Sequence, residues 1–165
     1  MTVADFETVA RLGESIWHSH YASIISDAQI DYMLADRYTP EKLRLYLDAK
    51  DCWLMLLRIS GNAVGYFSYA LTDQLDEMKV EQLYLLPELH GHGLGKTMLN
   101  HIEQQARAQG LGTLILQVNK HNAKAIAFYR KAGFTVREEA VFDIGNGFVM
   151  DDYVMAKSLL SAVTA

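Results

Sequence analysis

Residues 80–96 read VEQLYLLPELHGHGLGK. The apolar and aromatic residues at the start suit a buried strand, and Pro87 ends that strand because proline has no N–H to donate to a sheet. Gly91, Gly93 and Gly95 then remove side chains where a helix is about to begin. The first amides of a helix have no internal partner and carry the positive end of its dipole. The stretch therefore predicts a binding site for an anion, such as the phosphate of a nucleotide or cofactor.

Length and composition narrow the class of protein. The chain has 165 residues, which predicts one domain over residues 1–165 with a core that needs no disulfide or metal. Its net charge of −5 argues against nucleic acid or an anionic membrane as partner and fits a cationic substrate. The single cysteine, Cys52, cannot form an internal disulfide, which favours a reducing, cytoplasmic compartment. No apolar run resembles a signal peptide or a membrane span.

The periodicity of apolar residues predicts alternating helices and strands. Helices are expected over residues 4–19, from Asp27 as N-cap, from Thr39 to Ala49, from the glycine loop to Gln109, and over 123–132. Strands are expected over residues 52–59, 63–71, 78–86, 113–118, 135–142 and 148–156. Residues 60–62 and 143–147 are the expected hairpin turns. This order predicts an α/β fold with a mixed sheet and a parallel, right-handed crossover at 78–118.

Two familiar phosphate loops do not fit the glycine spacing. A P-loop that ends in Gly95-Lys96-Thr97 would need its first glycine at position 90, which is His90. The dinucleotide pattern Gly-x-Gly-x-x-Gly fails in both registers, at Lys96 and at Met98. The histidine pairs 18/20 and 90/92 have no Asp, Glu or Cys at a metal-site spacing, so no metal centre is predicted.

A third pattern fits and continues beyond the loop. It comprises Leu85-x-Pro87-x-x-His90-Gly91-His92-Gly93-Leu94-Gly95, then a helix, then Leu116-Gln117-Val118-Asn119-x-x-Asn122-x-x-Ala125-Ile126-x-Phe128-Tyr129-x-x-x-Gly133-Phe134. From about Glu77 to Phe134, and onward through Lys157, the chain resembles the GNAT superfamily of acetyl-CoA-dependent N-acetyltransferases. Two motifs in the right order and spacing are more specific than a glycine loop alone. The resemblance implies the GNAT fold, a mixed central sheet flanked by helices.

Two positions depart from the family pattern. The leading position of the loop, usually Gln or Arg, is His90, and only Met1–Val3 precede the first helix, so the N-terminal strand of the family is truncated or missing. Within the superfamily the chain looks most like polyamine acetyltransferases of the PaiA type and their uncharacterised relatives. The shared features are Glu81-x-Leu83-Tyr84-Leu85, the glycine loop and the ending Met150-Asp151-Asp152-Tyr153-Val154-Met155-x-Lys157.

The resemblance implies acetyl-CoA as cosubstrate and assigns residues to it. Backbone amides of Gly91–Lys96 would hold the CoA pyrophosphate, and backbone groups of Leu83–Leu85 would pair with the pantetheine arm. Asn122 matches a family asparagine that holds this arm, although asparagine also caps helices well. The implied cofactor-binding set is Leu83, Tyr84, Leu85, His90, Gly91, His92, Gly93, Leu94, Gly95, Lys96, Asn119 and Asn122.

Two residues are candidates for proton transfer. Tyr129 occupies the general-acid position of the family, where a phenol of pKa about 10 can protonate a departing thiolate of pKa about 8.5; the alternative is a core tyrosine. Relatives that modify protein N-termini use a Glu as base where this chain has Gln117, which cannot accept the proton. Glu81, a carboxylate in an apolar strand, is the better candidate for the base, because burial would raise its pKa. It would act directly or through water, and the alternative is a surface carboxylate.

The resemblance also implies an acceptor pocket. The first two helices of the chain would form the wall of this pocket, with Trp17, His18, Tyr21, Tyr32 and Met33. The alternative is that these residues only pack against the core. Asp151 and Asp152 are adjacent in a strand and face opposite sides, so at most one faces the site. We expect Asp152 to receive a substrate ammonium; a structural role is the alternative.

These features predict transfer of an acetyl group from acetyl-CoA to a primary amine. A small cationic amine of polyamine type is the favoured acceptor. A protein or peptide acceptor, and a CoA-binding regulatory domain without turnover, stay open as alternatives. Many members of the superfamily are dimers, so a homodimer is a further expectation.

Overall fold

The computed structural model describes residues 1–160. The elements are η1 (Val3–Asp5), α1 (Phe6–Tyr21), α2 (Asp27–Leu34), α3 (Pro40–Asp48), β1 (Cys52–Ile59), β2 (Asn62–Leu71), β3 (Glu77–Leu85), η2 (Pro87–Leu89), α4 (Leu94–Ala108), β4 (Thr113–Asn119), α5 (Ala123–Lys131), β5 (Thr135–Gly145) and β6 (Phe148–Ser158). Six strands are hydrogen-bonded in the order β1-β2-β3-β4-β6-β5. The β3–β4 pair is parallel, which confirms the mixed sheet. The chain begins with helix rather than strand, as the truncated N-terminus predicted.

The chain divides into two compact units. Unit 1 contains Met1–Ala70 and Gln82–Leu99, and unit 2 contains Leu71–Glu81 and the described residues from Asn100 onward. The three boundaries fall before the last residue of β2, within β3 and within α4. The domain expected from the sequence extends to residue 165, and its last five residues lie outside the described part of the chain.

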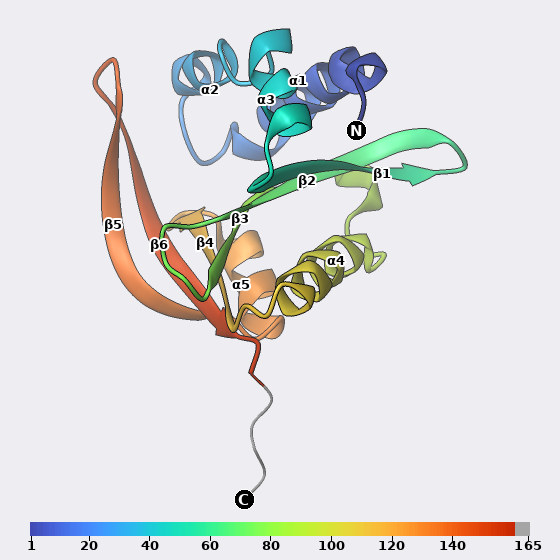
Figure 1. Ribbon diagram of the computed structural model, residues 1–165. Coiled ribbons are helices and arrows are strands. Elements are labelled where there is room, and N and C mark those ends of the chain that lie inside the picture. The colour runs from blue at the N-terminus through green and yellow to red at the C-terminus, as the bar shows by residue number, and fades with distance from the viewer. Residues whose placement is uncertain (161–165) are drawn as a thin grey trace, which may run out of the picture. The chain divides into compact units, whose positions relative to one another are not determined.

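Local capping chemistry fixes α2 and α3, which lie with α1 beside the β1–β2 hairpin (Figure 1). Thr39 caps α3 by accepting a hydrogen bond from the Lys42 amide, with Pro40 at the first helical position, as predicted. The predicted cap of α2 is wrong by one residue. Ser26 accepts from the Gln29 amide, and Asp27 is the first helical residue, where its charge suits the helix dipole.

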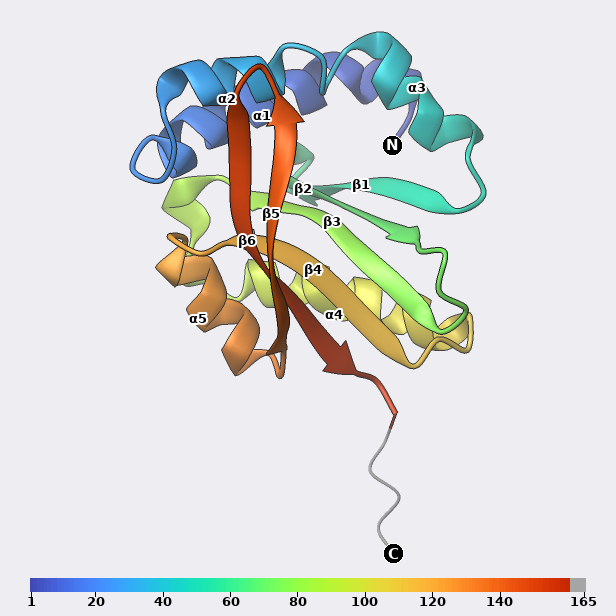
Figure 2. The same ribbon diagram turned by 90° about the vertical axis from the view of Figure 1, so that its left-hand side faces the viewer.

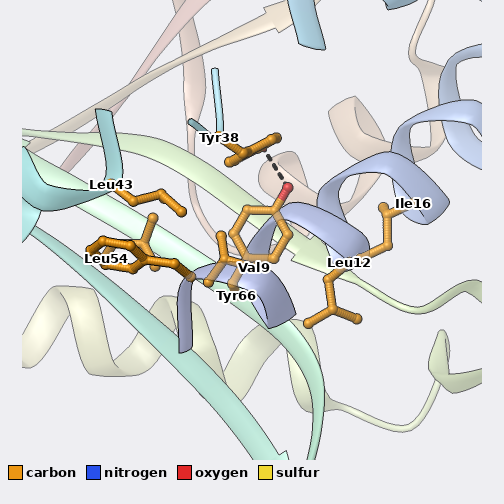
Figure 3. Close-up of a cluster of buried hydrophobic side chains, with 8 residues drawn as sticks. Val9, Leu12, Ile16, Tyr38, Leu43, Leu54 and Tyr66 are labelled. Atoms are coloured by element: carbon orange, nitrogen blue, oxygen red, sulfur yellow. Dashed lines mark hydrogen bonds between the residues drawn. The ribbon is translucent and has the colours of Figure 1, made fainter. Parts of the chain in front are cut away.

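The core of unit 1 is apolar but contains a small hydroxyl network (Figure 3). Apolar side chains from α1, α3 and β1 surround Tyr66, including Val9, Leu12, Ile16, Leu43 and Leu54. The Tyr66 hydroxyl lies 2.6 Å from the Tyr38 hydroxyl, which donates to Gln82 Oε1 at 3.1 Å. Burial raises the pKa of both tyrosines above the usual range, so both stay neutral.

Removing one hydroxyl from this network is expected to destabilise the protein. Tyr66→Phe deletes one buried hydrogen bond, so the free energy of unfolding should fall by about 1 kcal/mol. Tyr153→Phe is the control, since Tyr153 is half-buried outside this network and phenylalanine keeps its ring beside Lys120. Chemical denaturation monitored by circular dichroism measures both variants. Equal stability of Tyr66→Phe and wild type would mean that the network adds nothing.

Unit 2 is built on β4 and the long β5–β6 hairpin (Figure 2). Asn146 and Gly147, both with positive φ, form its turn, so the loop is two residues long rather than the five predicted. β6 pairs with β4 through seven residues on its other side, from Thr113↔Ser158 to Asn119↔Asp152. Asp152 is therefore held within the sheet, opposite the last residue of β4.

Candidate functional site

The glycine loop in unit 1 has the backbone geometry of an anion cradle. Gly91 and Gly93 have φ of +83° and +79°, which disfavour any side chain, and a Cβ at either position would meet no atom within 4 Å. α4 begins directly afterwards at Leu94, so its first amides have no partner within the helix. Its first turn contains no acidic residue and carries Lys96, a cation at the positive end of the dipole. A bound anion would relieve this unfavourable charge.

The two loop histidines stabilise the loop itself. The carbonyl of Leu85 can only accept a hydrogen bond, so His90 donates to it from Nε2 at 3.1 Å. His92 Nδ1 lies 3.1 Å from the His90 carbonyl and 3.3 Å from that of Leu89. His90 thus ties the loop to the end of β3, and anion binding is left to the backbone. The departure from the family pattern at this position is compatible with the predicted cradle.

The last part of β3 runs close to β2 in unit 1. A Cβ at Gly65 would lie 2.5 Å from the Tyr84 carbonyl oxygen, so only glycine fits there. The Leu86 amide donates to the Val64 carbonyl at 3.0 Å. These contacts fix the backbone of Leu83–Leu85, whose pairing with a pantetheine arm stays a prediction.

An aromatic cluster in unit 1 contains two residues of the predicted acceptor wall, Trp17 and Tyr21, together with Tyr84. The rings of Tyr21 and Tyr84 lie 4.9 and 5.7 Å from Trp17, and their hydroxyls are 3.2 Å apart. Trp17 is only 2% exposed, and the guanidinium of Arg37 lies 5.2 Å from its ring centre. The cation that contacts the Trp17 ring is therefore Arg37 of the protein itself. Tyr32 is 39% exposed on α2, and its role as a wall residue also stays a prediction.

Arg37 is a charged residue that the sequence analysis missed. Burial alone would lower its pKa, but the phenol oxygens of Tyr84, Tyr38 and neighbouring tyrosines hold the pKa above its usual range. No carboxylate within residues 1–160 forms an ion pair with it, and its buried Nε has no hydrogen-bond partner there. The aromatic rings around Arg37 therefore stabilise its buried positive charge.

In unit 2 the sheet has one face packed on helices and one polar face. Residues paired directly across strands share a face. Leu114 pairs with Lys157, which bonds Glu103 of α4, so this face is covered by α4. Lys79 pairs with Ile115, and both lie on the opposite face. Asn119 is four residues after Ile115 in β4 and so lies on the same face, together with its partner Asp152. We call this second face, with Glu77, Lys79, Glu81, Gln117, Asn119 and Asp152, the polar face.

Asp152 and Glu77 are the two buried carboxylates of the polar face, and of these only Glu77 has an ion-pair partner within residues 1–160, Arg137. Asp152 is 6% exposed, and its Oδ1 has no hydrogen-bond partner in the described part of the chain. Burial and the neighbouring Asp151 raise the pKa of Asp152 to about 6, although Lys120 and Lys79 counteract this rise. Asp151 points to the other side and pairs with Lys120 at 2.5 Å. No register shift occurs at this pair of acids, so a β-bulge does not explain them.

Glu81 does not have the environment that the sequence analysis assumed. Its side chain is exposed and pairs with Lys79 at 3.1 Å. The prediction that the Glu81 carboxylate is buried, on which its choice as base depended, is therefore wrong. The reason is strand parity: the buried neighbour is Gln82, which is 5% exposed and bonds Tyr38.

The second motif places two asparagines at the end of β4 and a tyrosine on α5. Asn119 accepts a hydrogen bond from the His121 amide at 2.9 Å, and Asn122 caps α5 through the Ala125 amide at 3.2 Å. The capping role of Asn122 is thus confirmed. Tyr129 is half-buried on α5, with its ring 5.7 Å from Phe134. Ring packing orients Tyr129 while part of the side chain stays accessible.

A strand, a glycine loop with bare amides and a helix, in an α/β fold with a mixed sheet, define a class of proteins that bind phosphate-bearing cosubstrates. A model of the acetyltransferase (GNAT) family matches residues 15–134, and the chain belongs to this family. It is 33% identical over 113 residues to an IAA acetyltransferase of Azospirillum brasilense, covering 66% of this chain and 74% of that protein. It is 26% identical over 155 residues to a spermidine N(1)-acetyltransferase of Thermoplasma acidophilum, covering 92% of each.

Solved structures agree on the fold. The crystal structure of the PaiA N-acetyltransferase of Thermoplasma acidophilum in complex with coenzyme A superposes with a TM-score of 0.81 at 24% identity, covering 96% of this chain and 95% of that one. The protein is therefore an acetyl-CoA-dependent N-acetyltransferase with an amine acceptor. The open glycine cradle, the free helix amides and Lys96 fit the phosphates of acetyl-CoA. Within residues 1–160, no helix is long and apolar enough to cross a membrane.

Proposed function

We propose that the acceptor is a small cationic amine of polyamine type. The observation that carries this proposal is Asp152, a buried carboxylate on the polar face whose Oδ1 has no protein partner among the described residues. A buried polar atom without a partner is costly, and a substrate ammonium would satisfy it. The spermidine N(1)-acetyltransferase that resembles this chain over 92% of its length, and the net charge of −5, support the same class of acceptor.

The proposed chemistry is a direct transfer in a ternary complex. Acetyl-CoA supplies the thioester, with its pyrophosphate on the amides of Gly91–Lys96. Asp152 binds the amine, and holding the amine against the thioester accounts for much of the rate. Tyr129 returns a proton to the sulfur as the C–S bond breaks. Cys52 lies in β1, away from both motifs in the sequence, and no acyl-enzyme is needed.

An amine panel tests the acceptor. We expect thiol release from acetyl-CoA with spermidine and related diamines, and at least tenfold lower kcat/KM with peptides and amino acids. Preferred turnover of peptides would replace the proposal with a peptide N-acetyltransferase. CoA binding without turnover of any amine would favour a regulatory domain.

A further inference from the structure

The polar face of unit 2 holds three carboxylates, and two of them have cationic partners. Glu77 pairs with Arg137 at 2.5 Å, and Glu81 pairs with Lys79 at 3.1 Å. Asp152 differs from both because it forms no ion pair with any described residue; Glu77 is buried as well, but Arg137 occupies its carboxylate. A carboxylate that already pairs with a protein cation is less available to receive the ammonium of a substrate. Asp152 is therefore the carboxylate of this face best able to receive an ammonium and take up its proton.

The location of Asp152 suits contact with a substrate. Asp152, on β6, pairs with Asn119, which is the last residue of β4. β4 runs parallel to β3, so Asn119 marks the carboxyl end of a parallel strand. The carboxyl ends of parallel strands are where α/β proteins bind ligands. Asp152 lies on the face opposite α4, and its side chain is 6% exposed, so a substrate ammonium that reached it would be largely removed from water.

The charges around Asp152 come from three elements. Asp151 precedes it on β6, Lys120 follows β4, and Lys79 lies on β3. Each lysine has an acidic partner elsewhere: Lys120 pairs with Asp151 and with Glu139 of β5, and Lys79 pairs with Glu81. These pairings keep both lysines from forming an ion pair with Asp152. Burial and the charge of Asp151 therefore raise the pKa of Asp152 to about 6 against the opposing effect of the two lysines.

We propose that Asp152, rather than Glu81, is the base that accepts the proton of the acceptor ammonium. This inference rests on the proposed function for the presence of an amine, but not on which amine it is. The carboxylate takes one N–H proton, and the freed lone pair forms the N–C bond with the acetyl carbon. The C–S bond breaks, its electrons pass to sulfur, and Tyr129 protonates that sulfur. The nitrogen is still positively charged once the N–C bond has formed, and it loses its second proton to the Tyr129 phenolate, which restores the phenol and leaves a neutral amide. Asp152 then returns its proton to solvent.

The pH profile of Asp152→Asn tests the assignment. With the best acceptor of the panel, kcat/KM of wild type should rise with an apparent pKa near 6 and then level off, since kcat/KM reports the free enzyme. In Asp152→Asn only uncharged amine reacts, so kcat/KM should be about 10²-fold lower at pH 7 and keep rising with pH. Glu138→Gln, an exposed carboxylate on β5, is the control and should match wild type.

A second acceptor separates proton removal from binding. Hydroxylamine is uncharged near neutral pH, so Asp152→Asn should acetylate it at close to the wild-type rate. A higher KM for the charged amine with unchanged kcat would limit Asp152 to binding and overturn its role as base. Loss of the limb near pH 6 in Glu81→Gln, with the limb kept in Asp152→Asn, would return the role to Glu81. A different preferred amine in the panel would refute the polyamine acceptor and leave this test intact.

Thermal unfolding checks the burial of Asp152 without any substrate. The folded pKa of about 6 lies above the ordinary value of 3.8, so the folded state holds the proton more tightly. Stability from this group is complete below about pH 4 and is lost as pH rises toward 6. In Asp152→Asn the stability should no longer fall between about pH 4 and pH 6 on account of this residue, and the Tm at pH 8 should be higher than that of wild type. An identical Tm dependence in both proteins would contradict a buried, ionisable Asp152.

Discussion

Tyr129→Phe is expected to lower kcat by about 10²-fold or more while CoA affinity stays within about twofold, since general acids contribute 10²–10⁴-fold. The phenol, of pKa about 10, is a weaker acid than the departing thiol, of pKa about 8.5, so full proton transfer is uphill by roughly 1.5 pKa units, or about 2 kcal/mol, a cost that is small against the barrier for breaking the C–S bond. Phenylalanine keeps the ring contacts with Phe128 and Phe134, so packing should be maintained. Single-turnover kinetics and direct titration with CoA separate the two quantities.

The expected loss belongs to the chemical step alone. If Tyr129 acted only by packing, Tyr129→Phe would change Tm or the KM for acetyl-CoA and leave kcat within about twofold. Its position on α5 is fixed independently by the Asn122 cap at the helix start and by Gly133, with φ +96°, after its end. A lowered kcat with unchanged Tm therefore points to the hydroxyl group.

The helices and strands were largely predictable, because short-range chemistry determines them. Thr39 and Pro40 start α3, and β1 spans Cys52–Ile59 as expected. The error at Ser26 and Asp27 arose because both residues are good caps, and only the hydrogen bond to the Gln29 amide distinguishes them. The two-residue turn at Asn146 was hidden because β5 has a register shift between Asp143 and Gly145.

The candidate site was less predictable, because strand pairing decides which side chains are buried. Glu81 and Gln82 are neighbours in one strand, and periodicity alone does not say which of them faces the core. The sequence showed that Asp151 and Asp152 face opposite sides, but the pairing of Asp152 with Asn119 determines which is buried. Arg37 had no local signal at all, since its contact with Trp17 joins residues twenty positions apart. Long-range pairing thus moved the candidate base from Glu81 to Asp152.

Gly93→Val is expected to raise the Kd for CoA by roughly 10²-fold, because one lost charge-assisted hydrogen bond, at about 1.5–3 kcal/mol, corresponds to about 10–150-fold. Gly93 has φ +79°, which a β-branched residue avoids, so the loop must change its path just before α4. The loop amides would then no longer converge on the anion. Isothermal titration with CoA measures the Kd. For pantetheine, which lacks the pyrophosphate, Gly93→Val should raise the Kd by a smaller factor.

The matched control lies at the other end of the same helix. Gly110 has φ +75° and, like Gly93, no atom within 4 Å of an added Cβ. Gly110→Val therefore introduces similar backbone strain after α4, at the negative end of the dipole, where no anion is expected. We expect both variants to lose stability and only Gly93→Val to lose CoA affinity. Equal loss of affinity in both would mean that general strain on α4 weakens binding, and would contradict a pyrophosphate cradle at the glycine loop.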